Sequence, residues 1–280
     1  MNAANGRTWN DFRGRSVLVT GGTKGIGLAT GLAFGRRGAD VALTQKWGSA
    51  DADSICSQFE SCGAPRPKIL DADVAHDEDA GQVMAELHRH HDSLDILVSN
   101  VAFAPIVRSF DDFTRRGLHS AIDHTTWPII AYTRSAKAVF GRYPRYVIAL
   151  SSEGSESYHV NYDIVAASKA ALEALCRYLN HRLREHDSHV NVVRTRFTST
   201  ESLHQTAGEE FEPFVRKYAP DSFSRPEEVG DAIVGLCSGL MDAVAGQIVT
   251  VDGGATLFEN FSGLFAARAE RPISPAKRTP

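Results

Sequence analysis

Residues 16–27 read Ser-Val-Leu-Val-Thr-Gly-Gly-Thr-Lys-Gly-Ile-Gly. The first five form a short apolar and β-branched run, which is typical of a buried parallel strand. The glycines that follow allow a tight turn and a close approach of the backbone to a phosphate group, and a helix N-terminus attracts such an anion. The stretch therefore predicts a strand, a nucleotide-binding turn and the start of a helix.

The rest of the chain continues this alternation of strand and helix. Such alternation predicts a mostly parallel sheet with helices on both faces, which is a doubly wound, Rossmann-type α/β fold. The expected strands are residues 16–20, 40–44, 68–70, 95–99, 146–150, 190–194 and 247–251. The expected helices are residues 25–37, 78–91, 114–140 with a kink at Pro128, 165–185 and 226–238.

The domain organisation follows from the same pattern. Residues 1–257 are expected to form one domain, and the tail of residues 258–280 is expected to be mobile. Residues 198–225 are too many for a plain connection and predict a lid inserted in the domain. The lid contains an amphipathic repeat, whose apolar side is expected to close over the substrate and whose cations are expected to point outward. The apolar residues are Phe211, Phe214, Val215 and Tyr218, and the cations are Arg216 and Lys217.

Composition limits the classes of function. The 280 residues carry a net charge of −4, which argues against a nucleic-acid or anionic-membrane partner. No apolar run approaches the ~18 residues that span a membrane, and the N-terminus lacks a signal core, so we expect a cytoplasmic protein. The four cysteines are scattered, which predicts reduced thiols, and no metal site is expected. The cluster of His88, His90 and His91 is interpreted as an exposed helix end.

Several motifs together resemble one family. Residues 20–27 have the spacing Thr-Gly-x-x-x-Gly-x-Gly, and similar landmarks occur at residues 73–74, 97–100, 225–229 and 246–254. This combination resembles the short-chain dehydrogenase/reductase superfamily over residues 14–257. The resemblance implies that the contacts to a dinucleotide come from Gly21, Thr23, Lys24, Gly25, Ile26, Gly27, Asp73, Val74, Asn100, Thr198 and Thr200.

The choice of dinucleotide depends on the end of the second expected strand. NAD binding usually places an acid there to hold the ribose hydroxyls. Here the strand is followed by Gln45 and Lys46, and Asp40 lies too early to serve. Lys24 stands in the phosphate loop, where similar NADPH-dependent proteins carry a basic residue. Two cations without a competing carboxylate favour NADPH as the cofactor.

The candidate catalytic residues depart from the commonest pattern of the superfamily. Ser168-Lys169-Ala170-Ala171-Leu172 fits the lysine motif, but Val165 stands four residues before the lysine, where a tyrosine is usual. Tyr162 lies seven residues before Lys169, and the two can share one face of a helix that extends so far. This spacing resembles the enoyl-acyl-carrier-protein reductases, especially the NADPH-dependent type III enzymes.

The resemblance implies a role for each residue of this site. Tyr162 would donate a hydrogen bond to the thioester oxygen where negative charge develops. Lys169 would hold the nicotinamide ribose and assist proton relay. Ser152, seventeen positions before Lys169, would polarise the substrate oxygen, and Tyr158 would add a second hydroxyl. Tyr178, on the same expected helix, is interpreted as a packing residue.

Three functions remain open at this point. The leading one is NADPH-dependent reduction of the C=C bond of an α,β-unsaturated acyl thioester, in fatty-acid or polyketide assembly, with an acyl carrier protein as partner. The others are a carbonyl reductase or ketoreductase, and a non-catalytic nucleotide-binding protein. The last is suggested by two departures, Asp123 or His124 for a family asparagine and Thr195-Arg196 for Pro-Gly. The resemblance also implies a homo-oligomer, most simply a homotetramer, to which Trp127, Ile129 and Ile130 would offer apolar surface.

Overall fold

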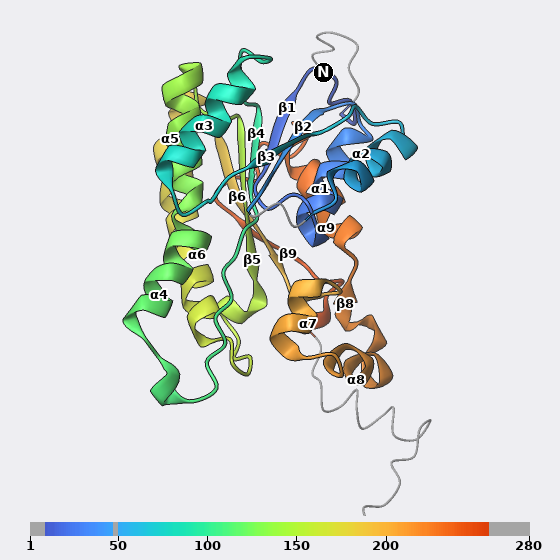
Figure 1. Ribbon diagram of the computed structural model, residues 1–280, viewed down its shortest axis with the longest axis vertical. Helices are drawn as coiled ribbons and strands as arrows, with labels where there is room; N and C mark the ends of the chain where they lie inside the picture. The colour runs from blue at the N-terminus through green and yellow to red at the C-terminus, as the bar shows by residue number, and fades with distance from the viewer. Residues whose placement is uncertain (1–8, 47–49, 258–280) are drawn as a thin grey trace, which may run out of the picture.

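The computed structural model of the chain describes residues 9–46 and 50–257. A parallel sheet of seven strands occupies its centre, in the order β3-β2-β1-β4-β5-β6-β9 (Figure 1). The strands are β1 (Ser16–Val19), β2 (Asp40–Gln45), β3 (Lys68–Asp71), β4 (Ile96–Ser99), β5 (Tyr146–Ser152), β6 (His189–Thr195) and β9 (Ile248–Val251). The predicted Rossmann-type fold is confirmed. The strand order reverses between β1 and β4, which is where sheets of this kind form a ligand crevice.

Helices cover both faces of the sheet (Figure 1). One face carries α1 (Gly25–Gly35), α2 (Ala52–Ser61) and α9 (Pro226–Leu236), and the other carries α3 (Asp77–His88), α5 (Pro128–Phe140) and α6 (Asp163–Leu183). Successive strand residues supply the two cores, because side chains alternate along a strand. Val17 and Val19 thus join the first core, and Leu18 joins the second.

Helix α2 is an element that the sequence patterns did not predict. Its start is marked by Asp51, whose carboxylate accepts hydrogen bonds from the backbone N–H groups of Asp53 and Ser54. Its buried side includes Ile55 and Phe59, which lie four residues apart. A capping residue followed by this spacing is the signal that identifies the helix.

The long helix expected over residues 114–140 is divided. Helix α4 (Arg115–Ala121) passes into a π-helical turn, Ile122–Thr126, before α5 begins at Pro128. The backbone N–H of Trp127 bonds to the carbonyl of Ile122, five residues earlier, at 2.9 Å. Proline has no N–H to continue the usual ladder, so the irregularity lies on its N-terminal side. The break occurs one turn before the predicted kink.

The expected lid segment contains regular structure. Strand β7 (Phe197–Thr198) pairs in parallel with β8 (Phe223–Ser224), and between them lie α7 (Glu201–Ala207) and α8 (Phe211–Tyr218). Figure 1 shows these helices beyond the lower edge of the sheet, beside the end of β5. The predicted mobile tail, residues 258–280, lies outside the described residues. Within the described part, no helix is both long and apolar enough to cross a membrane.

The positions of the cysteines and of several side chains on α5 and α6 test further expectations. All four cysteines are free thiols, as expected. Ile129 is fully buried in the core beneath α5, so it offers no outer surface, whereas Trp127 is partly exposed. Tyr178 is 71% exposed, so its interpretation as a residue packed within the chain is wrong.

Candidate active site

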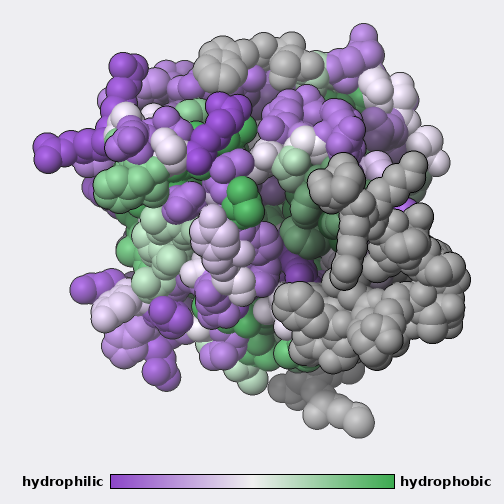
Figure 2. Space-filling model, turned by 90° about the horizontal axis from the view of Figure 1, so that it is seen from below, coloured by the Kyte–Doolittle hydropathy of each residue, from purple (hydrophilic) through white to green (hydrophobic). Residues whose placement is uncertain are grey.

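A cavity of about 790 Å³ lies at the carboxyl ends of the central strands. Residues that end or follow β1, β4, β5 and β6 form one wall, and α7 with Phe211 forms the opposite wall. Figure 2 looks onto this end of the molecule and shows hydrophobic surface between hydrophilic surroundings. The strand-end wall includes Gly21, Asn100, Ser152 and Thr198, and the opposite wall includes Leu203, Thr206, Ala207 and Phe211.

The glycine-rich loop packs so closely that it admits no side chains at two positions. A Cβ at Gly27 would lie 2.3 Å from the carbonyl oxygen of Gly21, and a Cβ at Gly21 would lie 2.8 Å from Val101. Gly21 also has a φ of 60°, a left-handed conformation that favours glycine. The side-chain amide of Asn100 holds the loop by donating to the carbonyls of Thr20 and Gly21, at 3.1 and 3.0 Å. The loop is therefore a rigid backbone cradle.

The residues present fit an extended dinucleotide. Thr198 Oγ1, in the wall of the main cavity, is buried without a hydrogen-bond partner. A second, smaller cavity beyond Gly21 is lined by Gln45, whose Oε1 is likewise buried and unpartnered. Both cavities share Gly21 and Val101, so together they form an elongated site with an unused polar group in each part.

The structure brings most of the expected cofactor residues to these two cavities. The main cavity is lined by Gly21, Lys24, Gly25, Ile26, Asn100, Lys169, Thr198 and Thr200. The smaller cavity is lined by Lys46, Asp73 and Val74. Thr23 and Gly27 belong to the same loop but line neither cavity.

The expectation that both lysines lack a competing carboxylate is wrong. Lys24 Nζ lies 2.9 Å from Glu201 Oε2 at the start of α7, in an exposed pair. Lys46 pairs with Asp73, because β2 and β3 are adjacent and both residues follow their carboxyl ends. Burial alone would raise the pKa of Asp73, but the hydrogen bond and charge of Lys46 bring it below its ordinary value. His124, the residue considered in place of the family asparagine, lies 3.6 Å from the same carboxylate.

Tyr162 and Lys169 line the same cavity, although only the lysine is inside α6. Tyr162 is the residue immediately before the helix, and its carbonyl accepts the hydrogen bond of Ala166 N–H at 2.8 Å. Lys169 is buried, and its Nζ donates to the carbonyl of Leu150 at 2.6 Å. Burial lowers the pKa of Lys169 to about 8, and the negative charge of Glu173 opposes this shift.

The ring of Tyr162 rests against Gly154, where a Cβ would lie 2.6 Å from two ring carbons. Burial raises the pKa of the Tyr162 phenol, and a hydrogen bond with Ser152 partly opposes that shift. Ser152 Oγ also accepts from Gly154 N–H at 3.3 Å. Tyr158 lines the cavity but is 82% exposed, so it lies at the mouth.

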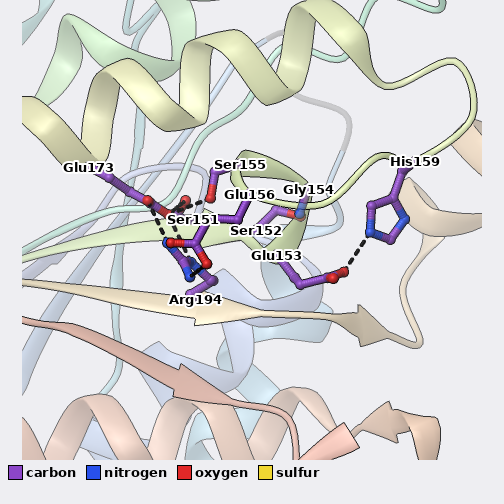
Figure 3. Close-up of polar contacts among 9 residues, drawn as sticks. All are labelled: Ser151, Ser152, Glu153, Gly154, Ser155, Glu156, His159, Glu173 and Arg194. Atoms are coloured by element: carbon purple, nitrogen blue, oxygen red, sulfur yellow. Dashed lines mark hydrogen bonds and ion pairs between the residues drawn. The ribbon is translucent and has the colours of Figure 1, made fainter. Parts of the chain in front are cut away.

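A buried charge network fixes the end of β5, which bears Ser152 (Figure 3). Glu173 accepts hydrogen bonds from Ser151 at 2.6 Å, Ser155 at 2.8 Å and Arg194 at 2.7 and 3.0 Å. The side chains of Arg194 and Glu173 are only 8% and 6% exposed, and Arg194 also pairs with Glu156 at 2.6 Å. Burial would raise the pKa of Glu173, but Arg194 and the two serines lower it below its ordinary value.

Several polar residues of the cavity wall were not among the expected site residues. His159 and Asn161 come from the loop before α6, and Arg196 occupies the place of the expected glycine after β6. Arg196 Nη1 donates to the carbonyl of Ala255 at 2.8 Å, and its charge lies over the ring of Phe197. The signal available for this wall was the clustering of polar residues before the lysine helix.

Of the four apolar residues expected to face the substrate from the lid, only Phe211 lines the cavity. Phe211 packs edge-on against Phe197, with ring centroids 5.1 Å apart. Phe214 is 63% exposed, so it does not cover the cavity. Arg216, expected to point outward, pairs with Glu212 at 2.7 Å and lies over Phe223.

Among the described residues, no group of acids, histidines and cysteines is arranged to hold a metal ion.

The fold, the glycine loop and the tyrosine–lysine pair together define a nicotinamide-nucleotide oxidoreductase. The family described as enoyl-(acyl carrier protein) reductase matches residues 21–256. The enoyl-[acyl-carrier-protein] reductase [NADH] FabI of Aquifex aeolicus is 29% identical over 254 residues, which are 87% of this chain and 92% of the relative. The Escherichia coli protein of the same name is 27% identical over 259 residues, 87% of this chain and 95% of that relative.

Solved structures agree with this comparison. The Aquifex aeolicus reductase superposes with a TM-score of 0.72 at 26% identity, over 88% of this chain and 98% of that chain. A short-chain dehydrogenase of Burkholderia cenocepacia, solved with NADP, has a TM-score of 0.76 at 24% identity and shares the fold, over 88% of this chain and 99% of that chain. The chain therefore belongs to the enoyl-(acyl carrier protein) reductase family of the short-chain dehydrogenase/reductase superfamily.

Proposed function

We propose that the protein reduces the C=C bond of an α,β-unsaturated acyl thioester with NADPH. The observation that carries this proposal is the placement of Tyr162 and Lys169, seven residues apart, in one cavity. Val165, at the position of the usual tyrosine, is buried in the core and offers no hydroxyl. We therefore assign the catalytic hydroxyl to Tyr162, whose seven-residue separation from Lys169 is typical of enoyl reductases.

The chain's own groups divide the chemistry between them. A bound nicotinamide cofactor would supply a hydride to the β-carbon. Tyr162 donates a hydrogen bond to the thioester oxygen as the enolate forms, and its raised pKa keeps it a donor at neutral pH. Lys169 binds the ribose hydroxyls near the carbonyl of Leu150 and places positive charge beside the site. The walls of α7 and Phe211 hold the acyl chain and exclude water.

A second candidate is the reduction of a ketone by the same residues. The hydrogen bond between Ser152 and Tyr162 favours it, because a serine–tyrosine pair can polarise a carbonyl oxygen. NADPH oxidation with crotonyl and acetoacetyl thioesters in parallel separates the two. Turnover of the crotonyl thioester supports the enoyl proposal, and turnover of the acetoacetyl thioester alone would replace it with ketone reduction.

We expect NADPH to bind more tightly than NADH. Lys46 lies beside Gln45 in the smaller cavity, and Lys24 lies in the phosphate loop, so each can exchange its carboxylate partner for a 2′-phosphate. Loss of one charge-assisted contact costs about 1.5–3 kcal/mol, so Lys46→Ala and Lys24→Ala should each weaken NADPH binding about ten- to a hundredfold. Calorimetric titration measures this, with NADH affinity as the control. Equal affinities for NADPH and NADH, or an unchanged NADPH affinity in Lys24→Ala, would contradict the assignment of NADPH as the preferred cofactor. The protein would then resemble the relatives whose names include NADH.

The family resemblance also carries a proposal about partners. The substrate is presented on an acyl carrier protein, with α7 and α8 as the lid that faces it. The protein assembles as a homo-oligomer through α5 and α6, where Trp127 and Tyr178 expose aromatic surface.

A further inference from the structure

A histidine of the cavity wall, His159, is paired with a carboxylate behind it, and neither residue has yet been given a role. His159 Nε2 lies 2.5 Å from Glu153 Oε2, as Figure 3 shows. Both side chains are mostly buried, with 26% and 13% exposed. Arg196 Nε lies 3.9 Å from the same carboxylate. Glu153 is thus held between two basic groups.

The pair is directed at the reacting region by its neighbours. The His159 ring meets the ring of Tyr162 at a centroid distance of 6.1 Å and the ring of Phe197 at 5.7 Å. A Cβ at Gly154 would lie 3.5 Å from a His159 ring carbon and 2.6 Å from the Tyr162 ring. The two rings therefore flank the same small residue, and His159 also lines the cavity.

The carboxylate is suited to orient the imidazole ring. Burial would raise the pKa of Glu153, but hydrogen bonds with Ser157 and His159 and the charge of Arg196 lower it below its ordinary value. The carboxylate contacts Nε2 and orients the ring, which leaves Nδ1 as the nitrogen available to a ligand. Glu153 and Tyr162 contact the ring, and Arg196 lies beside the carboxylate that holds it.

Reduction of an enoyl thioester requires a proton at the α-carbon as well as a hydride at the β-carbon. The hydride forms the new bond at the β-carbon, and the π-electron pair moves to give an enolate. The α-carbon must then receive a proton. In the function proposed above, Tyr162 donates its O–H to the enolate oxygen, so a second group beside it can supply the proton to the carbon.

We propose that His159, oriented by Glu153, is the acid that protonates the α-carbon. The proposal rests on the enoyl-reductase function proposed above. The enolate electron pair forms the Cα–H bond, the N–H bond of the imidazolium breaks, and its electron pair stays on the ring nitrogen. Solvent at the cavity mouth then restores the proton.

The test is the reduction of crotonyl thioester by NADPH in D₂O, with the configuration of the deuterated α-carbon read by NMR. The wild type should place deuterium in one of the two α positions. His159→Gln keeps a hydrogen-bonding side chain but cannot deliver a proton as an acid. Its turnover should fall about a hundredfold, within the usual range for general acids, and its product should carry deuterium in both α positions. Its NADPH affinity should be unchanged, which excludes a folding defect.

The lid offers a matched control. His204 Nε2 lies 2.9 Å from Glu212 Oε2, a second histidine–glutamate pair, and neither residue lines the cavity. His204→Gln should keep the rate and the configuration of the wild type. If His159→Gln does so too, the acid assignment is overturned while the enoyl function stands. If the wild type reduces no enoyl thioester, both proposals fall together.

Discussion

Tyr162→Phe should lower turnover about a hundred- to a thousandfold while leaving the fold and cofactor affinity intact. The hydroxyl acts mainly as charge develops on the substrate oxygen, and the loss of one such donor costs about 3–4 kcal/mol of transition-state stabilisation. The ring itself keeps its contact with Gly154, since phenylalanine has the same ring atoms. The rate constant with crotonyl thioester and the dissociation constant for NADPH are the two measurements.

Tyr178→Phe is the control for this experiment. Tyr178 lies on α6 but is 71% exposed, so removal of its hydroxyl should leave turnover nearly unchanged. Normal turnover by Tyr162→Phe on the true substrate would show that the assignment is wrong. Tyr158, at the cavity mouth, would then become the candidate.

The second large effect concerns stability. Arg194→Met should reduce the free energy of unfolding by about 3–5 kcal/mol, because it leaves a buried carboxylate without its charged partner. Glu173 would keep only its serine hydrogen bonds, and Ser151 and Ser155 belong to the strand end and turn that bear Ser152. Urea unfolding of the purified protein measures the loss.

Two further variants identify the cause of that loss. Arg194→Met combined with Glu173→Gln removes both charges, so it should recover a large part of the stability. Arg66→Met removes an exposed partner of Glu60, and exposed pairs contribute about 0–1 kcal/mol. An Arg194→Met loss no larger than that of Arg66→Met would show that the buried pair does not hold this part of the fold.

Local patterns were enough to predict the sheet, most of the helices and the glycine loop. Apolar runs and glycine positions act over a few residues, and they determine β1, the turn after it and α1. Tyr162 and Lys169 were also within reach of local reasoning, because they are seven residues apart and Tyr162 directly precedes the helix that bears Lys169. Helix α2 was missed because only Ile55, Cys56 and Phe59 are buried on it.

The contacts that modify the site depend on distant parts of the chain. Glu201, the partner of Lys24, lies 177 residues away, and it reaches the loop only because α7 folds back over the cavity. Asp73 meets Lys46 because their strands are neighbours in the sheet. The His159–Glu153 pair is close in sequence, but it depends on the turn at Glu153–Ser155, which no periodicity predicts.

The pairing of β7 with β8 has a consequence for how relatives of this protein can diverge. Phe197↔Phe223 and Thr198↔Ser224 bring the two ends of the α7–α8 segment together at its base. Insertions, deletions and substitutions between them can change the depth and shape of the acyl wall without altering the register of the seven-stranded sheet, since a loop with fixed ends tolerates changes in length at small entropic cost. The candidate catalytic groups come from β5, α6 and the loop between them, outside that segment. In the proposed function, substrate range and chemical step thus depend on separate stretches of the chain, so we expect that the α7–α8 segment can be exchanged between homologues without loss of the chemical step.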